Sequence, residues 1–95
     1  MKFEWDENKN SSNKIKHGVT FEEATTVFDD KYAIYLEDKI HSIDEDRFFI
    51  IGMDNIFRKL TVCHCYRDKD EELVRIISAR KATKRESSLY EEGLV

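Results

Sequence analysis

The stretch that decides the fold runs from residue 72 to residue 92, ELVRIISARKATKRESSLYEE. Its first eight residues, ELVRIISA, are rich in aliphatic and β-branched side chains, which is typical of a strand. Its last twelve, KATKRESSLYEE, are helical in composition, and Thr83 followed by Glu86 has the spacing of a helix capping box. A strand that runs almost directly into a helix predicts a sheet with helices packed on it.

The same kind of pattern continues upstream of this stretch. Three more segments have strand composition and are separated by short polar stretches: YAIYLE (32–37), RFFIIGM (47–53) and FRKLTVCHCYR (57–67). Asp54 and Asn55 predict a tight hairpin turn between the last two. KFEWD (2–6) alternates apolar and polar residues, as a short strand with one buried face does.

Two helices are expected between the first strand and the second. TFEEATTVF (20–28) begins with a Thr20 and Glu23 capping box, and its apolar residues recur with helical spacing. ENKNSSNKIKHG (7–18) has the length of a helix, although Ile15 is its one apolar residue, and Gly18 suits a left-handed C-terminal cap. The predicted class is therefore α+β, with an antiparallel sheet of about four to five strands, two N-terminal helices and one C-terminal helix.

Length and composition place the chain among small folded proteins. Its 95 residues, 40% hydrophobic and 38% charged, predict one domain over residues 1–95 with its own core. The N-terminus has no apolar run typical of a signal peptide, and RFFIIGM is too short to cross a bilayer. Cys63 and Cys65 point the same way on a strand and should not form a disulfide. We therefore expect a cytoplasmic protein without a membrane partner.

Charge is distributed unevenly along the chain. The formal net charge is −4, and residues 20–46 carry nine acids against Lys31 and Lys39. Residues 75–85 carry five cationic residues and no acid: Arg75, Arg80, Lys81, Lys84 and Arg85. The acidic total argues against indiscriminate binding of nucleic acid, but it leaves room for one local basic site.

The basic residues of this junction fall into two groups. Strict alternation places Arg80 on one face of the strand, with Val74, and Arg75 on the other. Lys81, Lys84 and Arg85 lie at a helix start, where the helix dipole disfavours each cation by roughly 0.3–1 kcal/mol. Free helix N–H groups surrounded by cations are suited to a phosphate. The alternative is that these cations face solvent or pair with the protein's own acids, such as Glu45, Asp46, Glu71 or Glu72.

Two other places offer titratable side chains. Lys16 and His17 end the first predicted helix, where cations suit the dipole, and His17 could also transfer a proton near neutral pH. Cys63, His64 and Cys65 are consecutive in a strand, so at most two of them could bind one ion. We therefore predict no metal site and no cofactor.

Four separated motifs, taken together, resemble the BrnT toxins of type II toxin–antitoxin systems. They are FEWDENK (3–9), KHGVTFEEA (16–24), DEDRFFIIG (44–52) and RIISARKATKRESSLY (75–90). The family often has an Asp-Pro step after the second helix, whereas this chain has FDDKY (28–32). That departure affects a loop and not the expected site.

The resemblance implies a RelE-like fold and an endoribonuclease that cleaves mRNA without a metal and so inhibits translation and growth. It also implies a BrnA-type antitoxin with a ribbon-helix-helix domain, and binding of operator DNA only through the antitoxin. On this sequence the family motifs single out Lys16, His17, Arg47, Arg75 and Arg80.

Metal-free RNA cleavage by the 2′-hydroxyl needs a base, an acid and cations that stabilise charge on the phosphate. We expect Arg80 and Arg47 to hold the scissile phosphate, Arg75 to support them, and His17 or Lys16 to transfer a proton. Lys81, Lys84 and Arg85 are expected to bind the RNA backbone. Two other functions fit the residues alone: a non-catalytic module whose basic site docks an acidic partner, and a regulator that binds DNA by itself.

Overall fold

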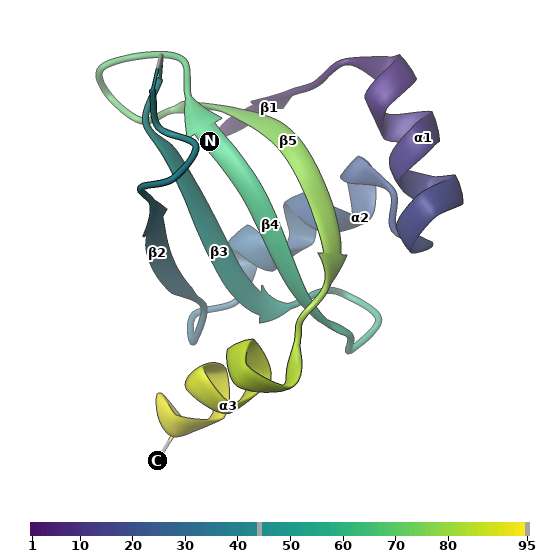
Figure 1. The fold of residues 1–95 in the computed structure, drawn as a ribbon, viewed down its shortest axis with the longest axis vertical. Helices are drawn as coiled ribbons and strands as arrows, with labels where there is room; N and C mark the ends of the chain where they lie inside the picture. The colour runs from purple at the N-terminus through teal and green to yellow at the C-terminus, as the bar shows by residue number, and fades with distance from the viewer. Residues whose placement is uncertain (44, 95) are drawn as a thin grey trace.

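The computed structural model of the chain describes residues 1–43 and 45–94. Its elements follow the predicted order (Figure 1): β1 (Lys2–Glu4), α1 (Glu7–His17), α2 (Phe21–Thr25), the 3-10 helix η1 (Thr26–Asp29), β2 (Ile34–Asp38), β3 (Arg47–Met53), β4 (Lys59–Tyr66), β5 (Leu73–Lys81) and α3 (Lys84–Glu92). Within the described part of the chain, no helix is long and apolar enough to cross a membrane.

The five strands form one sheet in the order β1-β5-β4-β3-β2. β2 to β5 are antiparallel neighbours, as predicted, but β1 pairs with Leu73–Arg75 of β5 in parallel, so the sheet is mixed and the expectation of a purely antiparallel sheet was wrong. The direction of β1 relative to β5 depends on the path that the chain takes between these two strands. Alternation of residues within β1 carries no information about that direction.

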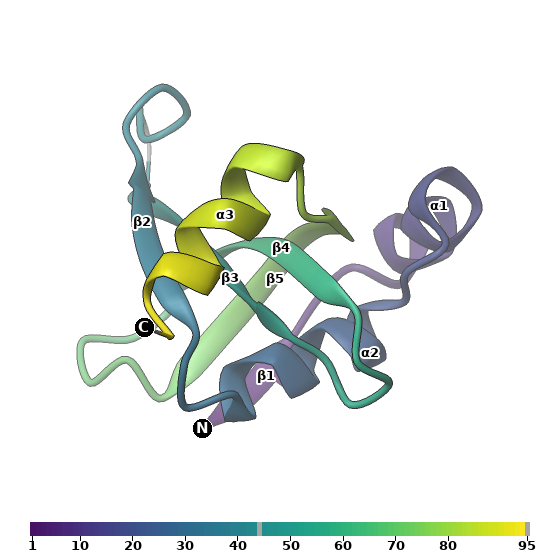
Figure 2. The ribbon, with the colours of Figure 1, turned by 90° about the horizontal axis from the view of Figure 1, so that it is seen from below.

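One face of the sheet carries the main core. Thr20 and Glu23 form the predicted capping box, and Phe21, Ala24 and Val27 are completely buried against the sheet. Figure 2 shows α2 beneath the strands and α3 on the opposite side. The helical face predicted from spacing is therefore confirmed, although the helix tightens to 3-10 geometry from Thr26.

The first helix is held by amides instead of apolar residues. Gly18 ends α1 in the left-handed conformation (φ 70°), as predicted, while Ile15 is 88% exposed. The Asn13 side chain donates to the carbonyls of Val19 (2.8 Å) and Ala79 (2.7 Å) and accepts from the Ala79 N–H (3.2 Å). β1 pairs with β5 only as far as Arg75. Beyond Arg75 this edge of β5 has no neighbouring strand among the described residues, and the Asn13 side chain bonds to the backbone of Ala79 there instead.

Replacing Asn13 by alanine should therefore lower the free energy of unfolding by about 2 kcal/mol, because it leaves buried backbone groups of Ala79 without partners. Urea unfolding followed by circular dichroism measures the change. Asn8→Ala, at an exposed position of the same helix, is the matched control and should alter stability by less than about 0.5 kcal/mol. Equal stability of the two variants would contradict this role of Asn13.

The last helix is anchored by a buried hydroxyl. The Tyr90 O–H donates to Asp30 Oδ2 (2.6 Å), which also accepts from the Met53 N–H (2.8 Å), and Tyr90 is only 3% exposed. Burial and the neighbouring carboxylate raise the pKa of Tyr90 to about 12. Asp30 thus supplies the partner that a buried tyrosine hydroxyl needs.

The turn between β3 and β4 is longer than predicted. The Asp54 N–H donates to the Arg58 carbonyl (2.9 Å), so residues 54–58 form the connection instead of Asp54 and Asn55 alone. Phe57 has a positive φ of 64° and is exposed. The loop is set by the Asp54 carboxylate, which accepts from the N–H groups of Ile56 (3.1 Å) and Arg58 (2.8 Å).

Candidate functional site

The sheet face that carries α3 is the candidate site, and we call it the arginine face. Leu60 and Val62 of β4 lie in the core, so Thr61, Cys63 and Cys65 point to the arginine face. In the ladders, Thr61 is opposite Arg80, Cys65 is opposite Arg75, and Cys63 is opposite Phe49, two residues after Arg47. Arg47, Arg75 and Arg80 therefore share one face.

A β-bulge brings Arg75 and Arg80 to the same side. The prediction from strict alternation placed them on opposite faces of the strand. In the structure Cys63 pairs with Ser78 and His64 with Ile76, so Ile77 has no cross-strand partner. This extra residue shifts the alternation, so that Ala79 joins Val74 and Ile76 in the core and Arg80 turns to the face of Arg75. The prediction of separate faces was therefore wrong.

Each of the three arginines lies beside a carboxylate of the protein itself. Arg75 Nη1 is 2.7 Å from Glu4 Oε2, and Arg80 binds Glu86 with two hydrogen bonds, of 2.7 and 3.0 Å. Arg47 Nε is 3.5 Å from Glu45 Oε1 but makes no hydrogen bond to any residue in 1–43 or 45–94. The sequence offered Glu45, Asp46, Glu71 and Glu72 as partners for the basic residues. Of these four acids, Glu45 lies beside an arginine of this face.

Glu86 occupies the place where a phosphate was expected. It closes the predicted capping box with Thr83 and accepts from Arg80 and from the Thr61 hydroxyl (2.9 Å). The hydrogen bond from Arg80 is the main reason why the pKa of Glu86 falls to about 2. The first turn of α3 therefore already has an anion. The basic side chains of this turn, Lys84 and Arg85, are exposed around it, and so is Lys81 just before the helix.

Lys16 and His17 lie apart from the arginine face. They end α1, which sits at the edge of β5 and not above the sheet (Figure 2). In the ranges that the structure describes, neither makes a hydrogen bond or ion pair with the three arginines. The structure therefore brings together Arg47, Arg75 and Arg80, but not the two residues expected to transfer a proton.

The two cysteines form part of the floor of the arginine face. Both are free and buried, and burial is the main reason why the pKa of Cys63 is raised to about 11, so its thiol stays neutral. His64 points to the opposite face, as alternation predicted. No group of three or more His, Cys, Asp or Glu side chains that could hold a metal ion occurs among the described residues.

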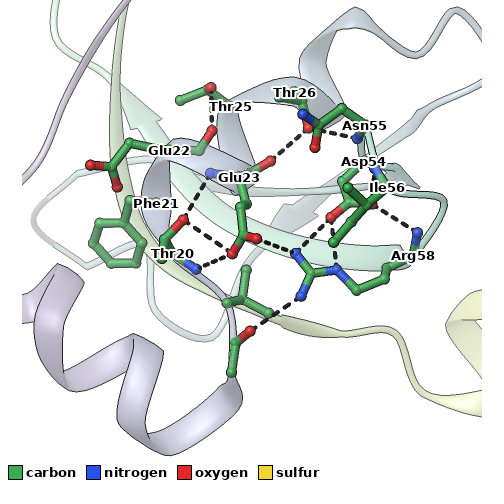
Figure 3. A network of polar contacts seen from close by, with 12 residues as sticks. Thr20, Phe21, Glu22, Glu23, Thr25, Thr26, Asp54, Asn55, Ile56 and Arg58 are labelled. Atoms are coloured by element: carbon green, nitrogen blue, oxygen red, sulfur yellow. Dashed lines mark hydrogen bonds and ion pairs between the residues drawn. The ribbon is translucent and has the colours of Figure 1, made fainter.

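A second polar cluster, drawn in Figure 3, has a structural role. Arg58 Nη2 is 2.7 Å from the buried Asp54 carboxylate and 3.3 Å from Glu23, and Arg58 Nη1 donates to the Gly18 carbonyl (3.2 Å). These contacts join the β3–β4 loop to the start of α2 and the end of α1. Since Arg58 is paired with two carboxylates, one of them completely buried, the cluster stabilises the packing of these segments.

Sequence reasoning did not single out Glu4, Asp38 or His41, and it identified Glu86 only as a capping residue of the last helix. Asp38 lies opposite Arg47 in the β2–β3 ladder, is 6% exposed and contacts His41 in the loop that follows. An aspartate at a strand end with a histidine three residues later is a local signal that could have been noticed. The partner of Arg75 carries no comparable signal, because Glu4 is 71 residues away from Arg75.

The fold and these motifs can be compared with known proteins. Residues 5–86 match the family model described as "Ribonuclease toxin, BrnT, of type II toxin-antitoxin system". The chain belongs to the BrnT family. The resemblance noted from the four sequence motifs is thereby confirmed, and the chain is a member of a family of ribonuclease toxins of type II toxin–antitoxin systems.

A solved BrnT structure agrees with this assignment. The crystal structure of the Brucella abortus ribonuclease toxin BrnT is similar to this chain with a TM-score of 0.67 and 28% sequence identity. The likeness covers 88% of this chain and 99% of the Brucella chain. Among curated proteins, none matches the chain in sequence. The BrnT fold here is thus the five-stranded mixed sheet with its three α-helices.

Proposed function

We propose that this BrnT chain is a RelE-like endoribonuclease that cleaves mRNA without a metal ion, as a single domain in the cytoplasm. The observation that carries the proposal is the placing of Arg47, Arg75 and Arg80 on one sheet face that α3 covers only in part. Guanidinium groups bind phosphate oxygens with two parallel hydrogen bonds, and they stabilise the charge that develops as the phosphate is attacked.

In this proposal the carboxylates of the site are exchanged for RNA phosphate. Arg80 and Arg47 hold the scissile phosphate, and Arg75 supports them from the neighbouring part of β5. Glu86 and Glu4 keep their arginines extended and oriented while the site is empty. Lys81, Lys84 and Arg85 are exposed at the end of β5 and the start of α3, where they would bind phosphates next to the cleaved one.

The proposed protein partner is a BrnA-type antitoxin with a ribbon-helix-helix domain, and operator DNA is contacted only through that antitoxin. Acidic side chains of the antitoxin would cover the arginine face, so that antitoxin and RNA exclude each other. Beside this face lies a hollow of about 460 Å³, whose lining includes the apolar side chains of Leu36, Phe49 and Leu89 as well as Arg85 and Glu86. It suits an apolar residue of the same bound segment.

A second candidate function is a non-catalytic module whose basic face serves only to dock an acidic protein. The hollow favours it, and so do the ion pairs of Arg75 and Arg80, because these arginines already bind carboxylates. The two functions differ in one measurable respect, because only the first breaks phosphodiester bonds.

The purified chain is expected to cleave single-stranded mRNA in the presence of EDTA and to leave a 2′,3′-cyclic phosphate, which gel electrophoresis and mass spectrometry of the products detect. Arg47→Ala should slow cleavage by about 100-fold, since it removes one cation from the phosphate site. Lys31→Ala, an exposed cation in the turn before β2, is the matched control and should be as active as the wild type. Tight binding of the antitoxin without any RNA cleavage would favour the docking module instead.

A further inference from the structure

The loop after β2 presents a histidine fixed by a buried carboxylate. His41 Nδ1 lies 3.0 Å and 3.2 Å from the two carboxylate oxygens of Asp38, and the His41 N–H donates to the same carboxylate (3.3 Å). The Asp38 side chain is 6% exposed, whereas that of His41 is 63% exposed. A carboxylate at Nδ1 favours the tautomer with the proton there, which leaves the Nε2 lone pair free to accept a proton.

The same loop places His41 beside Arg47. The two side chains line one hollow of about 310 Å³, together with Ile40, Ile43 and Glu45. Asp38 and Arg47 are opposite each other in the ladder, and the Ser42 hydroxyl donates to the Asp38 carbonyl and accepts from the Arg47 N–H. These bonds tie the loop that carries His41 to the strand end that carries Arg47.

Arg80 lies on the same sheet face as Arg47. Burial is the main reason for the raised pKa of Cys63, but the charges of Asp38, Arg47 and Arg80 act on this thiol as well. Asp38 lies opposite Arg47 in the ladder, so its side chain points to the arginine face, which also carries Arg80. His41 is joined to this face through Asp38, whereas His17 lies at the end of α1, at the β5 edge of the sheet.

We propose that His41 is the general base of RNA cleavage and that Asp38 is its positioning residue. This inference rests on the proposed ribonuclease function and replaces His17 or Lys16 in the proton-transfer role. Glu45 beside Arg47 lines the hollow too, but its carboxylate is engaged in ion pairs with Arg47 and Arg67.

In the step proposed, Nε2 of His41 accepts the proton of the 2′-hydroxyl as the 2′-oxygen forms a bond to phosphorus. The bond from phosphorus to the 5′-oxygen breaks, and the products are a 2′,3′-cyclic phosphate and a 5′-hydroxyl. The leaving 5′-oxygen takes its proton from solvent water, and the imidazolium releases its own proton to solvent, so protons and charge balance. Arg47 and Arg80 hold the phosphate oxygens during the attack.

The test uses the full chain and a short RNA with one cleavage site. His41→Ala should lower the cleavage rate about 100-fold, and added imidazole should restore a substantial part of it, because a small diffusible base can take the vacant position. Asp38→Asn should lower kcat and leave KM unchanged. Lys39→Ala, an exposed residue of the same loop, is the control for changes in loop structure, and circular dichroism checks that each variant is folded.

Four outcomes would overturn the proposal. Wild-type activity of folded His41→Ala excludes His41 as the base while the ribonuclease function stands. Loss of activity that imidazole does not restore, with a raised KM in Asp38→Asn, shows a role in loop structure only. Loss and imidazole rescue in His17→Ala instead assigns the base to α1. A wild-type chain that cleaves no RNA overturns the proposed function itself, and the role of His41 with it.

Discussion

Replacing Arg80 by alanine should lower RNA cleavage by about 1000-fold, at the upper end of what removal of one charged donor at a reacting centre costs. Arg80 has the largest expected effect of the three arginines because the bulge in β5 turns it to the arginine face, next to the start of α3 and its exposed cations. Its fork geometry is already set by two hydrogen bonds to Glu86, so little freedom is lost when it binds phosphate. Single-turnover cleavage of a labelled RNA measures the change.

The same substitution should also destabilise the protein. It leaves the Glu86 carboxylate, 18% exposed, without its cation, at a cost of about 1–2 kcal/mol once the partial exposure of Arg80 to solvent is taken into account. Arg80→Ala with Glu86→Gln removes the unpaired charge and should regain much of that stability without regaining activity. If the single variant is folded and cleaves RNA at the wild-type rate, Arg80 does not bind the scissile phosphate.

The second large effect is a loss of stability in mild acid caused by His64. This side chain is completely buried among aromatic rings, with Phe28 at 4.9 Å and Tyr66 at 5.4 Å between ring centres. Burial lowers the pKa of His64 to about 4, from 6.5. Its Nδ1 lies 3.2 Å from the Val62 carbonyl, and its Nε2 has no hydrogen-bond partner among the described residues.

The direction of the effect follows from the two pKa values. Above pH 6.5 the histidine is neutral in both the folded and the unfolded chain, so stability does not depend on it. Between pH 6.5 and pH 4 the unfolded chain takes up a proton that the folded chain refuses. The free energy of unfolding should therefore fall by about 3 kcal/mol across this window and then level off.

Urea unfolding at half-unit intervals from pH 7.5 to pH 3.5 measures this dependence. His64→Leu, which is similar in volume and has no titrating group, should flatten the curve between pH 6.5 and pH 4. Glu86 acts in a lower window: its pKa is depressed in the folded chain, so its contribution is complete above about pH 4.5 and is lost toward pH 2. Glu86→Gln should therefore alter only the lower window. An unchanged slope in His64→Leu would mean that other groups cause the acid sensitivity.

The sequence predicted best what depends on neighbouring residues. Both capping boxes, the left-handed Gly18 and the buried face of α2 are consequences of spacings of three or four residues, and all of them are present in the structure. α1 was harder to predict, since its buried side chains are Asn10 and Asn13, and hydrophobic periodicity does not detect a helix held by amide hydrogen bonds. The partners of these amides, among them Ala79, are far away in the sequence.

For the candidate site, residue types could be found in the sequence but their arrangement could not. Arg47, Arg75 and Arg80 stood out because they are cationic residues in apolar strands and because the family motifs include them. Alternation alone separated Arg75 from Arg80, and only the unpaired Ile77 brings them to one face. Nothing local linked Asp38 and His41 to Arg47, because their proximity depends on how β2 pairs with β3.

The sequence by itself determined the order of the elements, where most helices begin and end, and the family of the chain. These properties depend on hydrogen bonds and side-chain contacts within one turn or one strand, which the order of residues dictates directly. The tertiary structure decided that β1 is parallel, that the arginines share a face, and that Arg75 lies beside Glu4. It decided these because strand direction, a bulge and the Arg75–Glu4 ion pair depend on contacts between distant segments, and those contacts exist only once the sheet has formed.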